Sequence, residues 1–315
     1  MPSDSTTGVT GRGEERMTTV QDPTVQRRRL RGELRRARDA AGLRQAEVAH
    51  AMDWSPSKLI RIERGDVSVS TNDLRALLGH YGVKDKGRVN GLLELARSAR
   101  GASFYDQYAD LLKQGFKEYL AYEASASIIR QYDPVLVPGL LQTEEYGRAI
   151  LQWVAGLGLD AVERLWTVRR HRQEAIDREN PPEMLYVLDE AALRRHVGRG
   201  QVMQHQLEQL RDSTERPNVS IQIIPFTRGA HPGMAGNFIM LEFADPTLDD
   251  LVHLESINQI TIRDDTDLIA GYLDRFDRLQ ELALSPKESV DFLDMLIRDM
   301  TPRVQSTNSV PKEAV

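Results

Sequence analysis

Hydrophobic positions recur with helical spacing over residues 30–100, and this pattern predicts a succession of short helices. Two of these helices have clear start signals. Ser55 precedes a proline at the first helical position, and Ser70 is followed three residues later by Asp73, as in a capping box. We therefore predict an all-α domain over residues 27–100.

After residue 101 the pattern becomes mixed, with strand-like alternation as well as helical spacing. The expected helices cover residues 104–126, 143–154 and 159–178, with two amphipathic helices at the end, the second starting at Ser285-Pro286. The expected strands are 184–188, 219–223, 238–243, 251–254 and 259–262, with an extended segment at 127–138. The fold class is therefore multidomain, α and α+β: an all-α domain, then a mixed α+β domain that ends in two helices.

Both ends of the chain differ from these domains. Residues 1–26 are rich in Ser, Thr, Gly and Asp and have almost no apolar periodicity, so we expect a disordered leader. Residues 303–315 are expected to form a disordered tail. The expected domains are then 27–100 and 104–300.

Residues 43–65 meet the requirements of two short helices that cross steeply at a tight turn. A small residue, Ala49, stands where the helices must touch. Asp53 stands in the turn, where a residue that tolerates positive φ is needed. The apolar residues that can fill the elbow are Val48, Met52, Trp54, Leu59 and Ile62. The stretch therefore predicts a helix-turn-helix.

Residues 30–83 resemble the Xre or lambda-repressor family of helix-turn-helix proteins. The motifs that carry the resemblance are Leu34-Arg35, Gln45-x-Glu47-Val48-Ala49, Ser55-x-Ser57 and Ile62-Glu63-Arg64-Gly65. The chain departs from the family at Asp53, where glycine is common, and at Pro56, where a polar residue often reads a base. The resemblance implies double-stranded DNA as the ligand, and since one module buries little DNA, we expect a homodimer.

By this resemblance a recognition helix runs from about Ser55 to Arg64 and enters the major groove. Ser57, Lys58 and Arg61 would face base edges, because the neighbouring apolar positions of the helix must point into the core. The alternative is that Lys58 and Arg61 form a merely solvated face.

Arg44, Gln45 and the start of the recognition helix at Ser55 would hold phosphates, which fixes position without reading sequence. The family pattern also pairs Arg35 of the first helix with Glu63 of the third. The alternative is that Arg35 and Glu63 are two independent surface charges.

The charge of the chain is divided between its two parts. The formal net charge is −6, yet residues 27–100 have 17 Lys or Arg against 9 Asp or Glu, a balance of +8. The residues after 100 have a balance of −12. This division indicates one surface that attracts phosphate and one that repels it, although an arginine-rich solvated helix would give the same count.

Composition excludes several classes of protein. There is no cysteine, so disulfides and cysteine-ligated metal sites are excluded. Apolar residues make up 40%, and no apolar run reaches the 18 or so residues that span a bilayer. With no apolar segment typical of a secretion signal either, we expect a cytoplasmic, nucleoid-associated protein without membrane contact.

The second part of the chain has its own resemblance, over about residues 104–300. Its motifs are Val137-Pro138-Gly139-Leu140-Leu141-Gln142-Thr143, Leu188-Asp189-Glu190-Ala191-Ala192-Leu193 and Gly229-Ala230-His231-Pro232-Gly233. They resemble the actinobacterial Xre-type regulators that have a large C-terminal domain of uncharacterised activity. Such regulators are often described as antitoxin-like, and the resemblance implies a small protein partner encoded nearby.

Most of these motifs also have a structural explanation. Residues 137–143 fit a strand end, a turn and a helix start capped by Thr143, with a ligand loop as the alternative. Residues 229–236 contain three glycines and fit a conformational turn, with a ligand cradle as the alternative.

Catalysis by this part would need Asp189, Glu190, His196 and His231 to converge, which their spacing does not require. No metalloprotease, phosphate-loop, nucleophile-elbow or dinucleotide motif is present. We therefore expect no enzyme activity, no metal and no cofactor.

Three functions remain, and we rank them. The first is a transcriptional regulator whose C-terminal domain binds a small protein. The second is a regulator that senses a small molecule, which a deep apolar pocket with a few convergent polar groups would indicate. The third is a helix-turn-helix fused to an enzyme, which clustered Asp and His with shifted pKa values would indicate.

Overall fold

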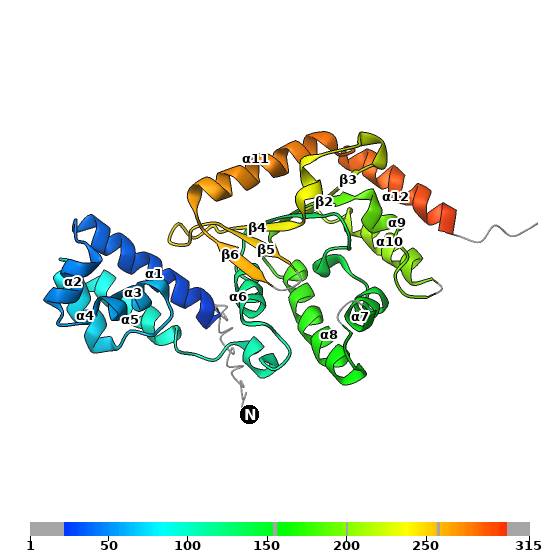
Figure 1. Cartoon of the computed structure of the whole chain (residues 1–315). Coiled ribbons are helices and arrows are strands. Elements are labelled where there is room, and N and C mark those ends of the chain that lie inside the picture. Colours follow the sequence, from blue (N-terminus) through cyan, green and yellow to red (C-terminus); the bar gives the residue numbers. More distant parts are fainter. Residues whose placement is uncertain (1–21, 154–155, 200, 257–258, 301–315) are drawn as a thin grey trace, which may run out of the picture.

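The chain folds into a group of helices at its N-terminal end and a larger part, the body, built on one sheet (Figure 1). This computed structural model describes residues 22–153, 156–199, 201–256 and 259–300. The expected leader lies largely outside the described residues, and the expected tail at 303–315 lies wholly outside them. The expected end of the leader at residue 26 was wrong, because helix α1 already begins at Pro23. Asp22 caps it by accepting a hydrogen bond from the amide of Thr24.

The N-terminal part is all helical in the described residues, as expected. Its helices are α1 (Pro23–Ala40), α2 (Gln45–Ala51), α3 (Pro56–Arg64), α4 (Thr71–His80) and α5 (Lys86–Ser98). Their core is a cluster of buried aliphatic side chains that includes Leu34, Val48, Ala49, Leu59, Ile62, Leu74, Leu77 and Leu93. Ser55 and Ser70 accept hydrogen bonds from the amides of Lys58 and Asp73, so both are confirmed as helix caps, whereas the Asp73 carboxylate binds Lys58.

The body contains a six-stranded sheet with the order β3-β2-β1-β4-β5-β6. The strands are β1 (Ile128–Asp133), β2 (Glu183–Asp189), β3 (Val219–Ile224), β4 (Phe238–Glu242), β5 (Leu251–Glu255) and β6 (Ile260–Arg263). β1, β2 and β3 run parallel, whereas β4, β5 and β6 pair antiparallel with their neighbours. All five expected strands are present, and β1 occupies the segment expected only to be extended.

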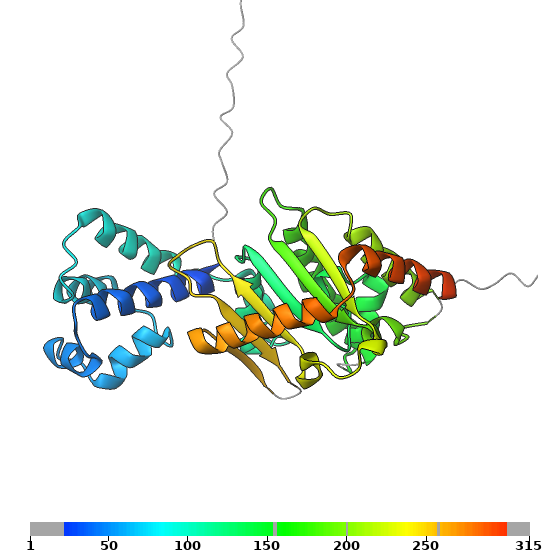
Figure 2. The same ribbon diagram turned by 90° about the horizontal axis from the view of Figure 1, so that it is seen from above.

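Apolar side chains alternate between the two faces of the sheet, so both faces are buried. Tyr132, Val187 and Phe238 pack toward α11 (Thr266–Leu282), which runs across one face (Figure 2). Residues at the alternate positions, such as Ile129, belong to the larger core on the other face. That face is covered by α6 (Gln114–Glu123), α7 (Glu144–Trp153), α8 (Leu159–Gln173), α10 (Val202–Ser213) and α12 (Pro286–Met300).

The helices of the body follow the expectations with three differences. A single helix over 104–126 was wrong: a 3-10 turn at Phe104–Tyr108 precedes α6, because the side chain of Ser103 and that of Asp106 close a capping box there. A 3-10 turn, Glu174–Asp177, follows α8, which ends at Gln173 rather than near 178. The sequence reading also missed α10 and the short α9 (Glu190–Arg194). The two closing helices are confirmed.

The first half of α1 is docked on the body. Val25 is fully buried in the core of the body rather than in that of the helical part. Arg29 pairs with Asp245 at 2.8 Å and Arg31 with Asp264 at 2.7 Å. Some of the positive charge of the N-terminal part is therefore neutralised by the acidic body. The expected boundary near residue 27 falls inside a helix that both parts share.

Candidate nucleic-acid interface

The turn between α2 and α3 has the local geometry that a helix-turn-helix needs. Asp53 has a φ of 53°, and in the described residues it is the one non-glycine residue with positive φ. Gly65 ends α3 in the left-handed conformation, with a φ of 81°. Ala49, at the crossing point, is fully buried. These features confirm the expected turn and the helix that was expected to follow it.

One face of α3 is buried and the opposite face is open. Leu59 and Ile62 lie in the core of the helical part. Ser57 and Arg61 are exposed, as expected for residues that could reach base edges. Arg44, which precedes the first turn of α2, is exposed too, and its amide donates to Oε2 of Glu47 at 2.8 Å. Ser55 is exposed but already accepts the hydrogen bond that caps α3.

Lys58 has the expected position but also has partners within the chain. Its ammonium lies 3.2 Å from Oδ2 of Asp73 and 3.8 Å from the centre of the Trp54 ring. The first contact holds the side chain close to the start of α4, and the second holds it against the turn before α3. Lys58 must therefore leave an ion pair before it can contact a base.

Gln45 also has an internal partner. Its side-chain amide donates to Oε2 of Glu63 at 2.7 Å, which links α2 to α3. The Gln45 side chain is therefore directed toward the buried Glu63 carboxylate. Its backbone amide, at the start of α2, remains in the place expected for a phosphate contact.

The expected ion pair between Arg35 and Glu63 was wrong. Glu63 is buried, and its carboxylate is held by Arg38 instead, with Nε 2.7 Å from Oε1 and Nη2 3.1 Å from Oε2. Tyr81 lies 3.5 Å from the same carboxylate. Arg35 is exposed. The hydrogen bond and the charge of Glu63 raise the pKa of Arg38, and burial is the main cause that raises that of Tyr81.

Helical spacing could have identified the correct arginine. Leu30, Leu34 and Ala37 are the positions of α1 that lie in the core of the helical part. Arg38 lies four residues after Leu34 and therefore on the same face, whereas Arg35 follows Leu34 directly and points elsewhere.

The candidate catalytic residues of the body meet only in part. His231 Nε2 lies 3.2 Å from Oδ2 of Asp189. The neighbouring carboxylate of Glu190 accepts a hydrogen bond from the amide of Phe226 and pairs with Arg194. His196 is exposed and lies beside α10 and α12 instead. Within the described ranges, no three His, Asp or Glu side chains are placed to share a metal ion.

The loop at 229–236 supports the conformational explanation of its glycines. Gly229 and Gly236 have positive φ values of 68° and 131°. At Gly233, a Cβ atom would lie 2.3 Å from the ring of Tyr132. The glycines are therefore required by the path of the loop and by its close approach to β1.

The sequence reading missed a buried polar cluster under the sheet. Arg172 of α8 donates from Nε and Nη2 to the carboxylate of Glu123 on α6, at 2.7 and 2.8 Å. Tyr119 donates to the same carboxylate, and its ring packs against His253 of β5. This ion pair joins two helices to the sheet and leaves no charge of the pair uncompensated.

Two side chains on this face of the sheet have strongly shifted pKa values. Burial raises the pKa of Asp133, at the end of β1, to about 7, and a hydrogen bond from Gln131 partly opposes the shift. Burial lowers the pKa of His253 to about 4. His253 Nε2 is buried with no hydrogen-bond partner in the described structure.

Comparison with known families agrees with this division of the chain. Residues 29–89 match a family model described as a helix-turn-helix domain, the region that contains α2 and α3. Residues 116–295 match the model of a domain of unknown function, DUF5753, which covers almost all of the body. No similar curated protein and no similar solved structure was found. In the described ranges, no helix has the length and apolar character to cross a membrane.

The helix-turn-helix domain indicates a DNA-binding regulator, and the second match extends over more than half of the chain. The chain therefore belongs to the DUF5753 family.

Proposed function

We propose that this chain is a sequence-specific transcriptional regulator of the Xre type, which binds double-stranded DNA in the cytoplasm as a homodimer. The observation that carries the proposal is the division of α3 into two faces. Leu59 and Ile62 anchor one face in the core, and Ser57 and Arg61 occupy the exposed one. This arrangement suits a helix that lies in the major groove.

Arg61 and Arg44 would have different roles. Arg61, on the exposed face of α3, suits the O6 and N7 atoms of guanine. Arg44, before the first turn of α2, suits a phosphate, which positions the domain on any sequence. In a homodimer the two α3 helices would read half-sites about 10 base pairs apart, or a multiple of that spacing.

The test is a titration of operator and scrambled duplexes at several salt concentrations. The operator is found first by footprinting the protein on its own upstream region. Arg61→Ala is expected to cost about 1–3 kcal/mol on the operator and much less on scrambled DNA. Arg44→Ala is expected to weaken both duplexes equally and to reduce the salt slope by roughly one.

Arg211→Ala is the matched control, because it removes a partly exposed arginine from α10 of the body. It should leave both affinities unchanged. An unchanged operator-to-scrambled ratio in Arg61→Ala would exclude our placement of the recognition helix. If neither Arg44→Ala nor Arg61→Ala affected binding, α2 and α3 would be structural elements only.

For the body we propose binding of a small protein encoded nearby, as in antitoxin-like regulators. The resemblance of residues 137–143, 188–193 and 229–233 to such regulators supports this role. The test is co-expression of the full chain with the product of a neighbouring short reading frame, followed by size-exclusion chromatography. A shared peak is expected. Separate peaks from two folded proteins would contradict a protein partner.

A second candidate, a regulator that senses a small molecule, is favoured by one specific observation. A cleft of about 720 Å³ lies where the helical domain meets the body. That volume is within the range of small-molecule sites, although the lining is polar and charged and not the deep apolar pocket expected from the sequence. A melting temperature that rises with ligand concentration would support this candidate.

A further inference from the structure

The cleft between the two domains is rich in arginine. Its walls come from α1, from the segment after α3, from the end of α5 and from α6. The arginines that line it are Arg27, Arg28, Arg31, Arg64 and Arg100. The carboxylates that line it are Asp66 and Glu118. The lining is therefore strongly positive in a chain whose net charge is negative.

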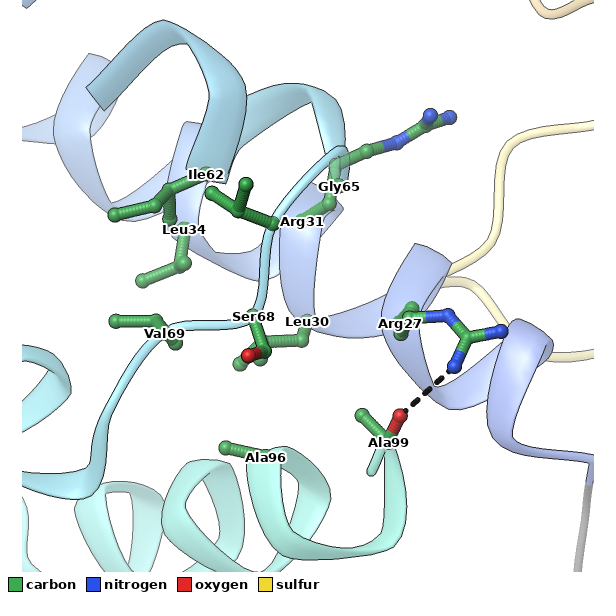
Figure 3. Close-up of a pocket in the computed structure, with 11 residues that line it drawn as sticks. Arg27, Leu30, Arg31, Leu34, Ile62, Gly65, Ser68, Val69, Ala96 and Ala99 are labelled. Carbon is green, nitrogen blue, oxygen red and sulfur yellow. Dashed lines mark hydrogen bonds between the residues drawn. The ribbon is translucent and has the colours of Figure 1, made fainter. Parts of the chain in front are cut away.

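Three of these arginines have no carboxylate partner within the described part of the chain. Arg27 donates to the carbonyl of Ala99 at 3.0 Å, as Figure 3 shows, and to the hydroxyl of Thr24 at 2.9 Å. Arg100 donates to the carbonyl of Val69 at 2.8 Å. Arg64 is exposed. Carbonyl and hydroxyl oxygens orient a guanidinium group but leave its charge in place.

Arg28 is the buried member of the group, with 5% of its surface exposed. Its Nη1 atom is buried and has no hydrogen-bond partner in the described structure. Its Nη2 atom lies 3.5 Å from the carbonyl of Asp250 and 3.6 Å from Asp264, a carboxylate that Arg31 binds more closely. Burial lowers the pKa of Arg28, as expected for a buried cation with incomplete compensation.

We propose that this cleft binds a small molecule with two or more oxyanion groups, either phosphates or carboxylates. Arginine forms paired, charge-assisted hydrogen bonds with both groups, and several arginines from different elements can each hold one. The ligand is expected to be polar, because an apolar recess beside the cleft, lined by Leu30, Leu34 and Ile62 (Figure 3), holds only about 20 Å³. That volume has room for about one water molecule.

A ligand in this cleft contacts both domains at once. Arg64 ends α3 and Arg100 follows α5, whereas Gln114 and Tyr122 belong to α6 of the body. The ligand therefore fixes how the recognition helix is held relative to the body. Since Arg64 lies at the end of α3 opposite to Ser57, DNA and ligand can be bound together. This regulatory consequence rests on the proposed function, but the binding of the anion does not.

The experiment uses the full chain and measures binding by calorimetry and by thermal melting. The probes are inorganic pyrophosphate and citrate, with sodium chloride at matched ionic strength as the reference. Saturable binding of either probe is expected, and the better probe tells phosphate from carboxylate. Arg64→Gln combined with Arg100→Gln should weaken binding at least tenfold. Arg35→Gln, an exposed change on the outer side of α1, should leave it unchanged.

Arg28→Met serves as a second variant, because the partly exposed Asp264 keeps its closer partner Arg31 when the Arg28 guanidinium is replaced by an apolar chain. Arg28→Met should also lower the affinity for the anion at least tenfold. Binding of neither probe, or equal binding in wild type and cleft variants, would overturn the proposal. So would competition by a short random duplex, which would make the cleft a DNA surface.

A final titration compares operator affinity with and without the bound anion, and a change of at least threefold is expected. Anion binding in a protein that binds no operator would leave the site in place while the proposed function failed. An anion that binds but leaves operator affinity unchanged would overturn the regulatory part.

Discussion

Arg38 Nε lies 2.7 Å from Glu63 Oε1, and this pair joins α1 to α3 inside the helical domain. Only 2% of the Glu63 side chain and 12% of the Arg38 side chain are exposed. Gln45 donates to the same carboxylate, so a single buried charge connects three helices. The exposed face of α3 is therefore positioned by a polar contact on its buried side.

The first prediction concerns this pair. Arg38→Met leaves the buried Glu63 carboxylate without its cation and should cost on the order of 3–5 kcal/mol. Glu63→Gln should cost a similar amount, and the double variant should cost clearly less than the sum of the two. Urea unfolding of the full chain, followed by circular dichroism, measures these values. Arg35→Met is the matched control and should change stability by less than about 0.5 kcal/mol. Additive losses in the double variant would exclude the pair.

Local features of the structure were predicted from the sequence more successfully than contacts between distant residues. Features set by a few neighbouring residues were predicted, such as the positive φ of Asp53 and the cap at Ser55. Strand alternation predicted the buried face of β3. Side-chain pairs across helices were not predicted reliably, because Arg35 and Arg38 differ only in the face of α1 on which they lie.

Contacts between distant segments were not predicted from the sequence. Nothing in residues 23–31 indicates that Asp245 and Asp264 would neutralise part of the basic segment. The buried pair of Glu123 and Arg172 was also missed, since its members are 49 positions apart and neither has a local motif. Such contacts depend on the packing of the whole body.

The second prediction concerns the restraint on Lys58. Its ion pair with Asp73 is partly exposed and is worth less than about 1 kcal/mol. Asp73→Asn should free Lys58 and remove a negative charge near the DNA, raising affinity about two- to fivefold on any sequence. In a Lys58→Gln background the gain should shrink. Fluorescence anisotropy at several salt concentrations measures both effects.

Glu94→Gln on α5 is the control for the second prediction, because it removes an exposed negative charge away from α3. It reports the general electrostatic gain alone. Equal gains in Asp73→Asn and Glu94→Gln would show that Lys58 is not restrained in solution.

The third prediction concerns the docking of α1. Asp245→Asn together with Asp264→Asn removes the carboxylates that pair with Arg29 and Arg31. Amide hydrogens near the start of α1 should then exchange faster with solvent, and higher salt should have the same effect on the wild type. Mass spectrometry of peptides that cover residues 23–31 measures the exchange.

Asp249→Asn is the matched control for docking, since Asp249 is exposed and lies in the same loop. In this variant the amide hydrogens of residues 23–31 should exchange at the wild-type rate. If the double variant also exchanged at the wild-type rate, the docking would depend on the buried Val25 and not on the ion pairs.

The last prediction is a pH dependence that arises at Asp133. Its pKa is raised to about 7, so between the unfolded value of about 3.9 and pH 7 the folded state holds the extra proton. Stability contributed by the neutral carboxyl is therefore lost as the pH rises through this window. His253, with a pKa lowered to about 4, has the opposite slope, but only up to the unfolded histidine value of about 6.5. Above that pH, His253 no longer opposes the slope that Asp133 contributes.

Asp133→Asn keeps an uncharged side chain of the same size at every pH. Its stability relative to the wild type should therefore grow from pH 6 to pH 8, by at most about 1.4 kcal/mol per pH unit, and then level off. Thermal melting in steps of half a pH unit measures the difference. Asp277→Asn, at an exposed position of α11, should show none of this growth. A difference between Asp133→Asn and wild type that stayed constant from pH 6 to pH 8 would mean that Asp133 is already ionised in the folded protein.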